Sequence, residues 1–417
     1  NTDNFFSSAL PITTTTVGSY SAMFGNLWFD IGSSGITGNW TGVFPSGTVG
    51  LTHGDLEIDN NNSNNISLWN GATSAYTIGR DLLTAGTSNI QVKVGAGGCL
   101  LTVKRNFTHS GAGDFRLHSY SSAATDSSIL YVNGDMSITG GTFAMQTTSA
   151  SSSPTRVWLS GSLTKGSGAY MTWNPNATGY LNDSYNFIGT GATQSVDVLP
   201  HVSNDMLRYR FFVKNGAYVK TKNQNWQFAD QAALTVESGA TMDFGFNSSG
   251  TTALNLTETT SSATTSFIMS GAAKIKITNP NGIDATATAA LDGNVQLDTR
   301  TYSTTGIYHY IGKTPSQRLG DGINFGGSSG KYVIVELDAL STALVFEGNS
   351  GSSTSTFTGL GNVGLSSSGS GLKIIQGTVV ATPTTGDFTS TGNIEMTGGL
   401  YQISIPASTS VVPQMTG

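Results

Sequence analysis

The residues best suited to bind a charged ligand gather in one stretch, residues 207–222. Apolar and basic residues alternate along its first half, which predicts a strand with one buried face. The basic positions are Arg208, Arg210, Lys214, Lys220 and Lys222, the last two after an Asn215-Gly216 turn. We expect them to form one continuous basic face. That face could contact an anionic glycan, or it could be an ordinary solvated strand face.

Carboxylates gather near the N-terminus, where residues 1–79 contain no Lys or Arg. Leu56 and Ile58 alternate there with acidic residues, which predicts a half-buried strand. The acidic positions are Asp55, Glu57 and Asp59. This acidic face is a candidate partner for the basic face of a second copy of the chain.

Catalytic and metal-binding arrangements are scarce in this sequence. The histidines are His53, His109, His118, His201 and His309, and they show neither metal-ligand spacing nor a partnered acid nearby in sequence. Only 11% of the residues are charged, so few carboxylates are available for a pair of catalytic acids. We therefore predict that the protein is not an enzyme and uses no cofactor and no metal.

Asn-linked glycosylation motifs occur eight times, at Asn39, Asn61, Asn65, Asn106, Asn176, Asn182, Asn247 and Asn255. Such motifs arise easily by chance in a chain this rich in Asn, Ser and Thr. They mark candidate modification sites and say nothing about occupancy.

Five similar stretches follow one another and predict the architecture that positions these residues. They read HGDLEI from residue 53, GRDLL from 79, KRNFT from 104, NGDMSI from 133 and SGSLT from 160. Their anchors at positions 54, 80, 105, 134 and 161 lie 25 to 29 residues apart. A period of this length is typical of stacked repeats, because one unit cannot bury its apolar face without its neighbours.

The fold class predicted from these observations is all-β, a parallel β-helix or β-solenoid with roughly 25–29 residues per coil. Short apolar strands alternate with Gly, Asn and Ser turns, and no segment shows convincing helical spacing. Residues 1–50 are predicted as a non-repeat N-terminal cap or strand-exchange arm. Residues 51–200 are predicted as the regular solenoid and residues 201–417 as its looser continuation.

Net charge and the length of the apolar runs exclude some classes of binding partner. The net charge of −6 argues against nucleic-acid binding. No apolar run reaches the roughly 18–20 residues of a membrane helix, so we predict no membrane insertion. The chain starts at Asn1 without a leader, and we interpret it as a processed mature chain or a fragment of a longer protein.

Five segments carry a family resemblance: ITNPNGI at 277–283, GNVQ at 293–296, RTYSTTGIYHY at 300–310, GDMSITGGTF at 134–143 and the region 39–45. They resemble parts of very large secreted surface proteins of Bacteroidota. Proteins of that group resemble adhesins and filaments exported by the type IX secretion route. The resemblance implies an extracellular or cell-surface location and self-association into a homo-oligomer or filament.

The sequence thus favours a non-catalytic extracellular structural protein, a subunit or segment of a surface filament or adhesin. Self-association and contact with a glycan or another cell-surface ligand are the expected interactions. The alternative is a carbohydrate-binding or polysaccharide-cleaving β-helix protein, because that fold also hosts such functions.

Overall fold

The computed structural model consists of parallel β-strands, and its described part contains no helix. The prediction of an all-β parallel β-helix is confirmed. The structure describes residues 3–7, 23–32, 40–41, 49–70, 73–95, 97–119, 127–146, 154–172, 183–200, 205–206, 208–259, 264–284, 293–303, 305–313, 316–320, 332–337, 343–346, 371–381, 389–390, 394–403 and 414–415. The chain divides into unit 1 (Asn1–Phe212, Gln227–Ala233 and Thr259–Ser262) and unit 2 (Val213–Trp226, Leu234–Glu258 and Ala263–Gly417).

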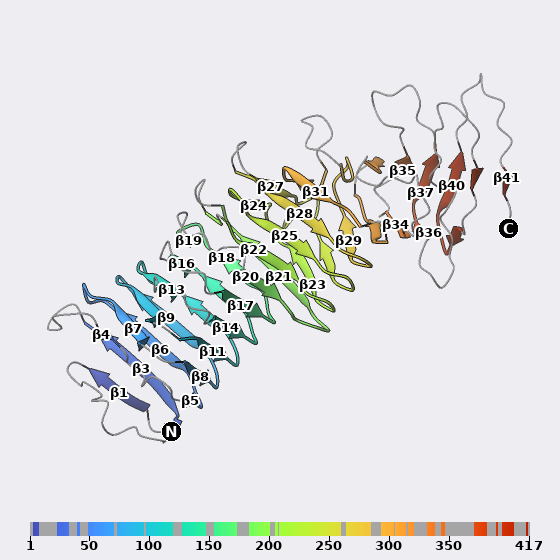
Figure 1. Cartoon of the computed structure of the whole chain (residues 1–417). Helices are drawn as coiled ribbons and strands as arrows, with labels where there is room; N and C mark the ends of the chain where they lie inside the picture. The colour runs from blue at the N-terminus through green and yellow to red at the C-terminus, as the bar shows by residue number, and fades with distance from the viewer. Residues whose placement is uncertain are drawn as a thin grey trace. The chain divides into compact units, whose positions relative to one another are not determined.

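Unit 1 is a three-sided solenoid in which each coil adds one strand to each sheet (Figure 1). Its first sheet has the order β1 (Asp3–Ser7), β3 (Asn26–Ile31), β6 (Leu56–Asn60), β9 (Leu82–Gly86), β12 (Phe107–His109), β15 (Met136–Ile138), β18 (Leu163–Lys165) and β21 (Thr193–Val198). Its second sheet has the order β2 (Met23–Phe24), β5 (Val49–Thr52), β8 (Ser74–Ile78), β11 (Cys99–Val103), β14 (Ser128–Val132), β17 (Thr155–Leu159) and β20 (Ser184–Phe187). Its third sheet has the order β4 (Trp40–Thr41), β7 (Ile66–Asn70), β10 (Ile90–Val94), β13 (Asp114–His118), β16 (Gly141–Gln146) and β19 (Ala169–Thr172).

Unit 2 repeats the plan with smaller sheets. Its first sheet contains β23 (Tyr218–Thr221), β26 (Thr241–Asp243), β29 (Lys274–Ile277), β32 (Ile307–Tyr310), β34 (Tyr332–Glu336), β36 (Gly371–Gln376) and β39 (Ile394–Met396). The pairs and short sheets beside it contain β27 (Leu256–Glu258) with β30 (Val295–Gln296), β28 (Ser266–Met269) with β31 (Thr299–Thr301), β33 (Ser316–Arg318) with β35 (Ala343–Phe346), β37 (Thr378–Ala381) and β40 (Leu400–Ile403), and β38 (Thr389–Ser390) with β41 (Gln414–Met415). Three strands contain residues of both units: β22 (Arg210–Val213), β24 (Trp226–Phe228) and β25 (Ala233–Val236). In the second sheet, β22 and β25 follow β20. The third strand, β24, pairs with β27.

The register of the first sheet confirms the repeat seen in the sequence. Leu56 pairs with Leu82, Leu82 with Phe107, Phe107 with Met136 and Met136 with Leu163. These five side chains are completely buried, and each contributes about 1.5–3 kcal/mol by leaving water. Leu27 on β3 continues this row within residues 1–50, since it pairs with Leu56. Whether that segment acts as a cap or as an exchanged arm stays a prediction.

The turn before each first-sheet strand is held by a ladder of side-chain oxygens, which we call the turn ladder. It consists of Asn26, Asp55, Asp81, Asn106, Asp135, Ser162 and Ser195. In each step the side-chain oxygen of one coil accepts the backbone N–H of the next, at 2.7–3.0 Å. The ladder explains why Asp, Asn or Ser follows each repeat anchor.

Glycine at the anchor has a steric cause. A Cβ on Gly134 would lie 2.5 Å from both the Arg105 carbonyl oxygen and the Asn106 side-chain oxygen. A Cβ on Gly161 would lie 2.3 Å from the Gly134 carbonyl oxygen. Successive turns therefore approach each other too closely for a side chain at these two positions.

Candidate functional site

The structure confirms the alternation predicted for residues 208–214. Tyr209, Phe211 and Val213 are buried, while Arg208, Arg210 and Lys214 are half-buried. The backbone N–H of Arg208 donates to the Asp230 carbonyl at 2.9 Å, and this residue has the left-handed φ of 59°. Leu207 lies outside the described residues.

The prediction of one continuous basic face is wrong. Arg210 lies on β22, a strand of the second-sheet order, whereas Lys220 lies on β23 in the first sheet of unit 2. The chain turns at Gly216, whose φ is +82°, and passes from one side of the coil to the next. At such a corner the chain leaves one sheet and enters another. The prediction failed because it placed both segments on the same sheet.

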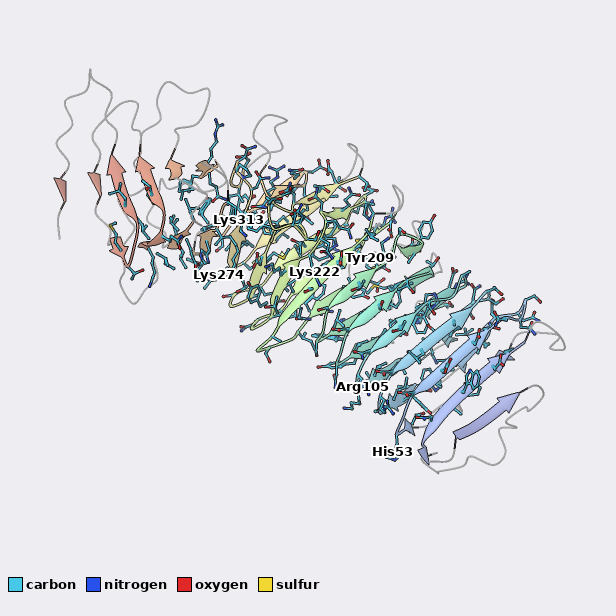
Figure 2. The ribbon with its side chains drawn as sticks, turned by 180° about the vertical axis from the view of Figure 1, so that it is seen from behind. His53, Arg105, Tyr209, Lys222, Lys274 and Lys313 are labelled. Atoms are coloured by element: carbon cyan, nitrogen blue, oxygen red, sulfur yellow. The ribbon has the colours of Figure 1, made fainter. Side chains whose placement is uncertain are left out.

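Two of the predicted cations are paired with acids of the neighbouring coil in unit 2. Lys214 Nζ bonds to Glu237, and both side chains are half-buried. Lys220 Nζ lies 4.0 Å from the nearly buried carboxylate of Asp243. Lys222 is exposed and is labelled in Figure 2. These pairs give Lys214 and Lys220 a structural role, and whether any of the five cations contacts a ligand stays a prediction.

Asp243 is the centre of a polar cluster on the first sheet of unit 2. The Tyr218 hydroxyl donates to Asp243 Oδ2 at 2.7 Å and accepts from Lys276 Nζ at 2.8 Å. The Gly245 amide donates to Asp243 Oδ1 at 2.8 Å. Burial and the adjacent carboxylate both raise the pKa of Tyr218, so its hydroxyl stays protonated and joins the lysine to the acid.

His309 extends this cluster along the same sheet. It pairs with Lys276 across β29 and β32, and its Nε2 lies 2.9 Å from Glu336 Oε2. Burial, followed by the charges of Lys274 and Lys276, lowers the pKa of His309 to about 3. Glu336 favours the protonated ring, but its side chain is 48% exposed, so water screens its charge. His309 is therefore neutral at neutral pH.

We call this set the charged face of unit 2; it comprises Tyr218, Lys220, Asp243, Lys274, Lys276, His309 and Glu336. Sequence reasoning missed most of it. Asp243, Lys276 and His309 occupy matching register positions, 33 residues apart at each step. The sequence does contain a signal for the strands of this face. The turns Ser238-Gly239 and Ser270-Gly271 precede β26 and β29.

The acidic face is a strand face as predicted. On β6, Leu56 and Ile58 are buried, and the flanking acids, Asp55, Glu57 and Asp59, are half-buried. Burial, followed by the charges of Asp59, Asp55 and Asp30, raises the pKa of Glu57. Asp55 belongs to the turn ladder and lies 3.5 Å from Arg80. Docking of this face against another copy stays a prediction.

The glycosylation motifs gain no support from exposure. Among the described ones, Asn61, Asn65, Asn106, Asn247 and Asn255 are half-buried, and each side chain takes part in a hydrogen bond within the chain. Asn39, Asn176 and Asn182 lie outside the described residues. Glycosylation stays a prediction at all eight positions.

Two histidines of unit 1 bond to hydroxyl groups inside the solenoid. His118 Nδ1 and Ser128 Oγ lie 2.8 Å apart, a spacing that suits a nucleophile and its base. Ser128 is nevertheless completely buried, and burial raises the pKa of the nearby Cys99 thiol to about 11. His109 Nε2 lies 2.9 Å from the Gly113 carbonyl and its Nδ1 lies 2.9 Å from Thr84 Oγ1. A buried hydroxyl without access to substrate is suited to holding a corner together.

The polar side chains of these arrangements are bonded to partners within the chain. Within the described ranges, no three His, Cys, Asp or Glu side chains are placed to hold a metal ion. No helix of the described structure is long and apolar enough to cross a membrane. Asp243 already accepts two hydrogen bonds and faces two lysines. Arg105, which is labelled in Figure 2, likewise has a partner, since its guanidinium lies 3.4 Å from the carboxylate of Asp81.

Comparisons with protein-family models, with curated proteins and with solved structures find no match for this chain.

Proposed function

We propose that this chain is a non-catalytic extracellular structural protein, a subunit or segment of a cell-surface filament or adhesin. The observation that carries the proposal is the use of charge on the outer faces. Lys220 and Lys276 turn toward the buried carboxylate of Asp243 on the coil between them, where they brace one coil against the next. Charges that are paired within the chain favour a structural role over an active site, which must bind and release substrate.

Parallel sheet edges offer a way to extend such a body. Among the described strands, β1 in unit 1 and β39 in unit 2 each have one hydrogen-bonded neighbour, β3 and β36 respectively. An edge strand presents unpaired N–H and C=O groups that another strand can complete. Further coils, from the same polypeptide or from a second copy, could add there and lengthen the solenoid.

Electron microscopy of negatively stained protein over a concentration series tests assembly, and light scattering gives the mass. We expect elongated polymers whose length grows with concentration. Short particles of monomer mass at every concentration would contradict filament formation. Antibody labelling of intact source cells tests the surface location, with permeabilised cells as the control. Labelling that requires permeabilisation would contradict it.

The polysaccharide-cleaving alternative is tested on the same preparation. Incubation with acidic polysaccharides should release neither new reducing ends nor unsaturated ends if the protein is structural. A time-dependent rise in either product, proportional to protein concentration, would overturn the non-catalytic proposal.

A further inference from the structure

The outer side of the second sheet in unit 1 bears a row of large side chains that the core does not use. Leu101, Leu130 and Val157 point inward and are completely buried. The alternate residues of β11, β14 and β17 therefore point outward. One of these six residues is Thr102, and the other five are large. We call these five the aromatic face of unit 1: Leu100, Ile129, Tyr131, Arg156 and Trp158.

Tyr131 and Trp158 are paired across adjacent strands of this face. Neighbouring strands lie about 4.8 Å apart, so the two residues lie side by side along the direction of stacking. Both rings are half-buried, and Leu100, which is 40% exposed, lies on the next strand. An apolar cluster of this kind on an outer face commonly marks an interaction site.

Charge on this face is positive and unneutralised. Arg80, Arg105 and Arg116 of unit 1 lie within 3.5 Å of an aspartate. Arg156 has no such partner in the described part of the chain and is half-buried between Ile129 and Ser184 in the register. The outward positions of β11, β14, β17 and β20 contain no Asp or Glu.

These properties favour one kind of ligand. A sugar ring presents a face of C–H groups that packs on an aromatic ring, and its hydroxyls bond to polar neighbours. Thr102 supplies a hydroxyl on the strand next to Tyr131. A guanidinium binds a carboxylate or sulfate with two parallel hydrogen bonds. A linear polymer can follow the row from strand to strand and meet these groups in turn.

We propose that the aromatic face of unit 1 binds an acidic linear polysaccharide. Tyr131 and Trp158 stack on sugar rings, and Arg156 pairs with a carboxylate or sulfate group. The inference deepens the adhesin part of the proposed function, and it does not depend on polymer formation. Binding and assembly are measured separately, so failure of one is distinguishable from failure of the other.

The test measures binding of the full chain to immobilised polygalacturonate, to a sulfated galactan and to neutral dextran. Trp158→Leu keeps an apolar side chain but removes the ring, and Arg156→Gln removes the charge. We expect each to weaken binding of the acidic polymers by about tenfold or more. The matched controls are Trp28→Leu, a 39% exposed tryptophan on β3, and Arg80→Gln, an arginine of unit 1 that is paired with Asp55. Both controls should bind like the unchanged protein.

Three outcomes would overturn the proposal. Equal binding to dextran would remove the role of the charge, and unchanged binding in both face variants would remove the face itself. Loss of self-association in the face variants, without glycan binding in the parent, would instead assign the face to contact between copies. Circular dichroism of each variant ensures that loss of binding is not loss of folding.

Discussion

The charged face of unit 2 and the aromatic face of unit 1 are both outer sides of parallel sheets, but they use charge in opposite ways. On the charged face, Asp243 collects a tyrosine, a backbone amide and two lysines. On the aromatic face, Arg156 stands beside Trp158 and Tyr131 without an acid among the outward positions of β14 and β17. The contrast separates charge that holds coils together from charge that is left for a ligand.

The largest loss of stability should come from a buried pair inside unit 1. Lys165 Nζ lies 2.7 Å from Asp205 Oδ2 and donates to the Ala169 carbonyl at 2.9 Å, with both side chains almost fully buried. Lys165→Met leaves the carboxylate without its cation, and we expect a loss of about 3–5 kcal/mol. Hydrogen exchange of peptides spanning residues 163–172 measures it. The double variant Lys165→Met/Asp205→Asn keeps an acceptor for the Met171 amide and should recover most of the loss. No recovery would contradict an ion-pair origin.

A smaller loss of stability is expected when Asp243, the central acid of the charged face, loses its charge. Asp243→Asn keeps the size of the side chain but removes the charge that Lys220 and Lys276 face. Because the carboxylate is buried and accepts from Tyr218, we expect a loss of about 1–3 kcal/mol. Hydrogen exchange of the Gly245 amide, which donates to Asp243, measures the loss directly. Arg156→Gln on the other face should leave the stability of unit 1 unchanged, and equal losses for the two variants would remove the distinction between the faces.

Acid should weaken unit 2 through His309. Its pKa is lowered to about 3 in the folded chain, whereas the unfolded value is near 6.5. The unfolded state therefore takes up the proton first, and the stabilisation present above pH 6.5 is lost as the pH falls toward 3. His309→Gln, neutral at every pH, should remove this part of the slope. An NMR titration giving a pKa above 6.5 would show that Glu336 dominates over Lys274 and Lys276.

The smallest effect on stability is expected for the exposed ion pair between Lys214 and Glu237. Lys214 and Glu237 are both about one-third exposed, so water screens their attraction. Lys214→Gln should change the free energy of unfolding of unit 2 by no more than about 0.5 kcal/mol. Thermal unfolding in low and high salt measures the effect. A loss as large as that of Asp243→Asn would mean that exposed pairs also brace the coils.

The sequence predicted the coil period because each Gly and the following Asp, Asn or Ser serve a local need. The close approach at Gly134 and the oxygen of Asp135 both act at the turn, so they recur in the sequence. It also predicted the burial alternation around Leu56, since adjacent residues decide it.

The faces could not be predicted in the same way, because they join residues from different coils. The partnership of Tyr218 with Lys276 spans 58 residues, and the pairing of Tyr131 with Trp158 depends on register. The charges near residues 208–222 looked continuous in the sequence, and only the corner at Gly216 separates them.

The turn ladder gives unit 1 a direction along its stack. At every step the acceptor belongs to the earlier coil and the donor to the later one, as between Asp81 and Asn106. Along the ladder each coil therefore offers a side-chain oxygen to the coil that follows it and a backbone amide to the coil that precedes it. The two directions in which such a stack could grow are chemically different.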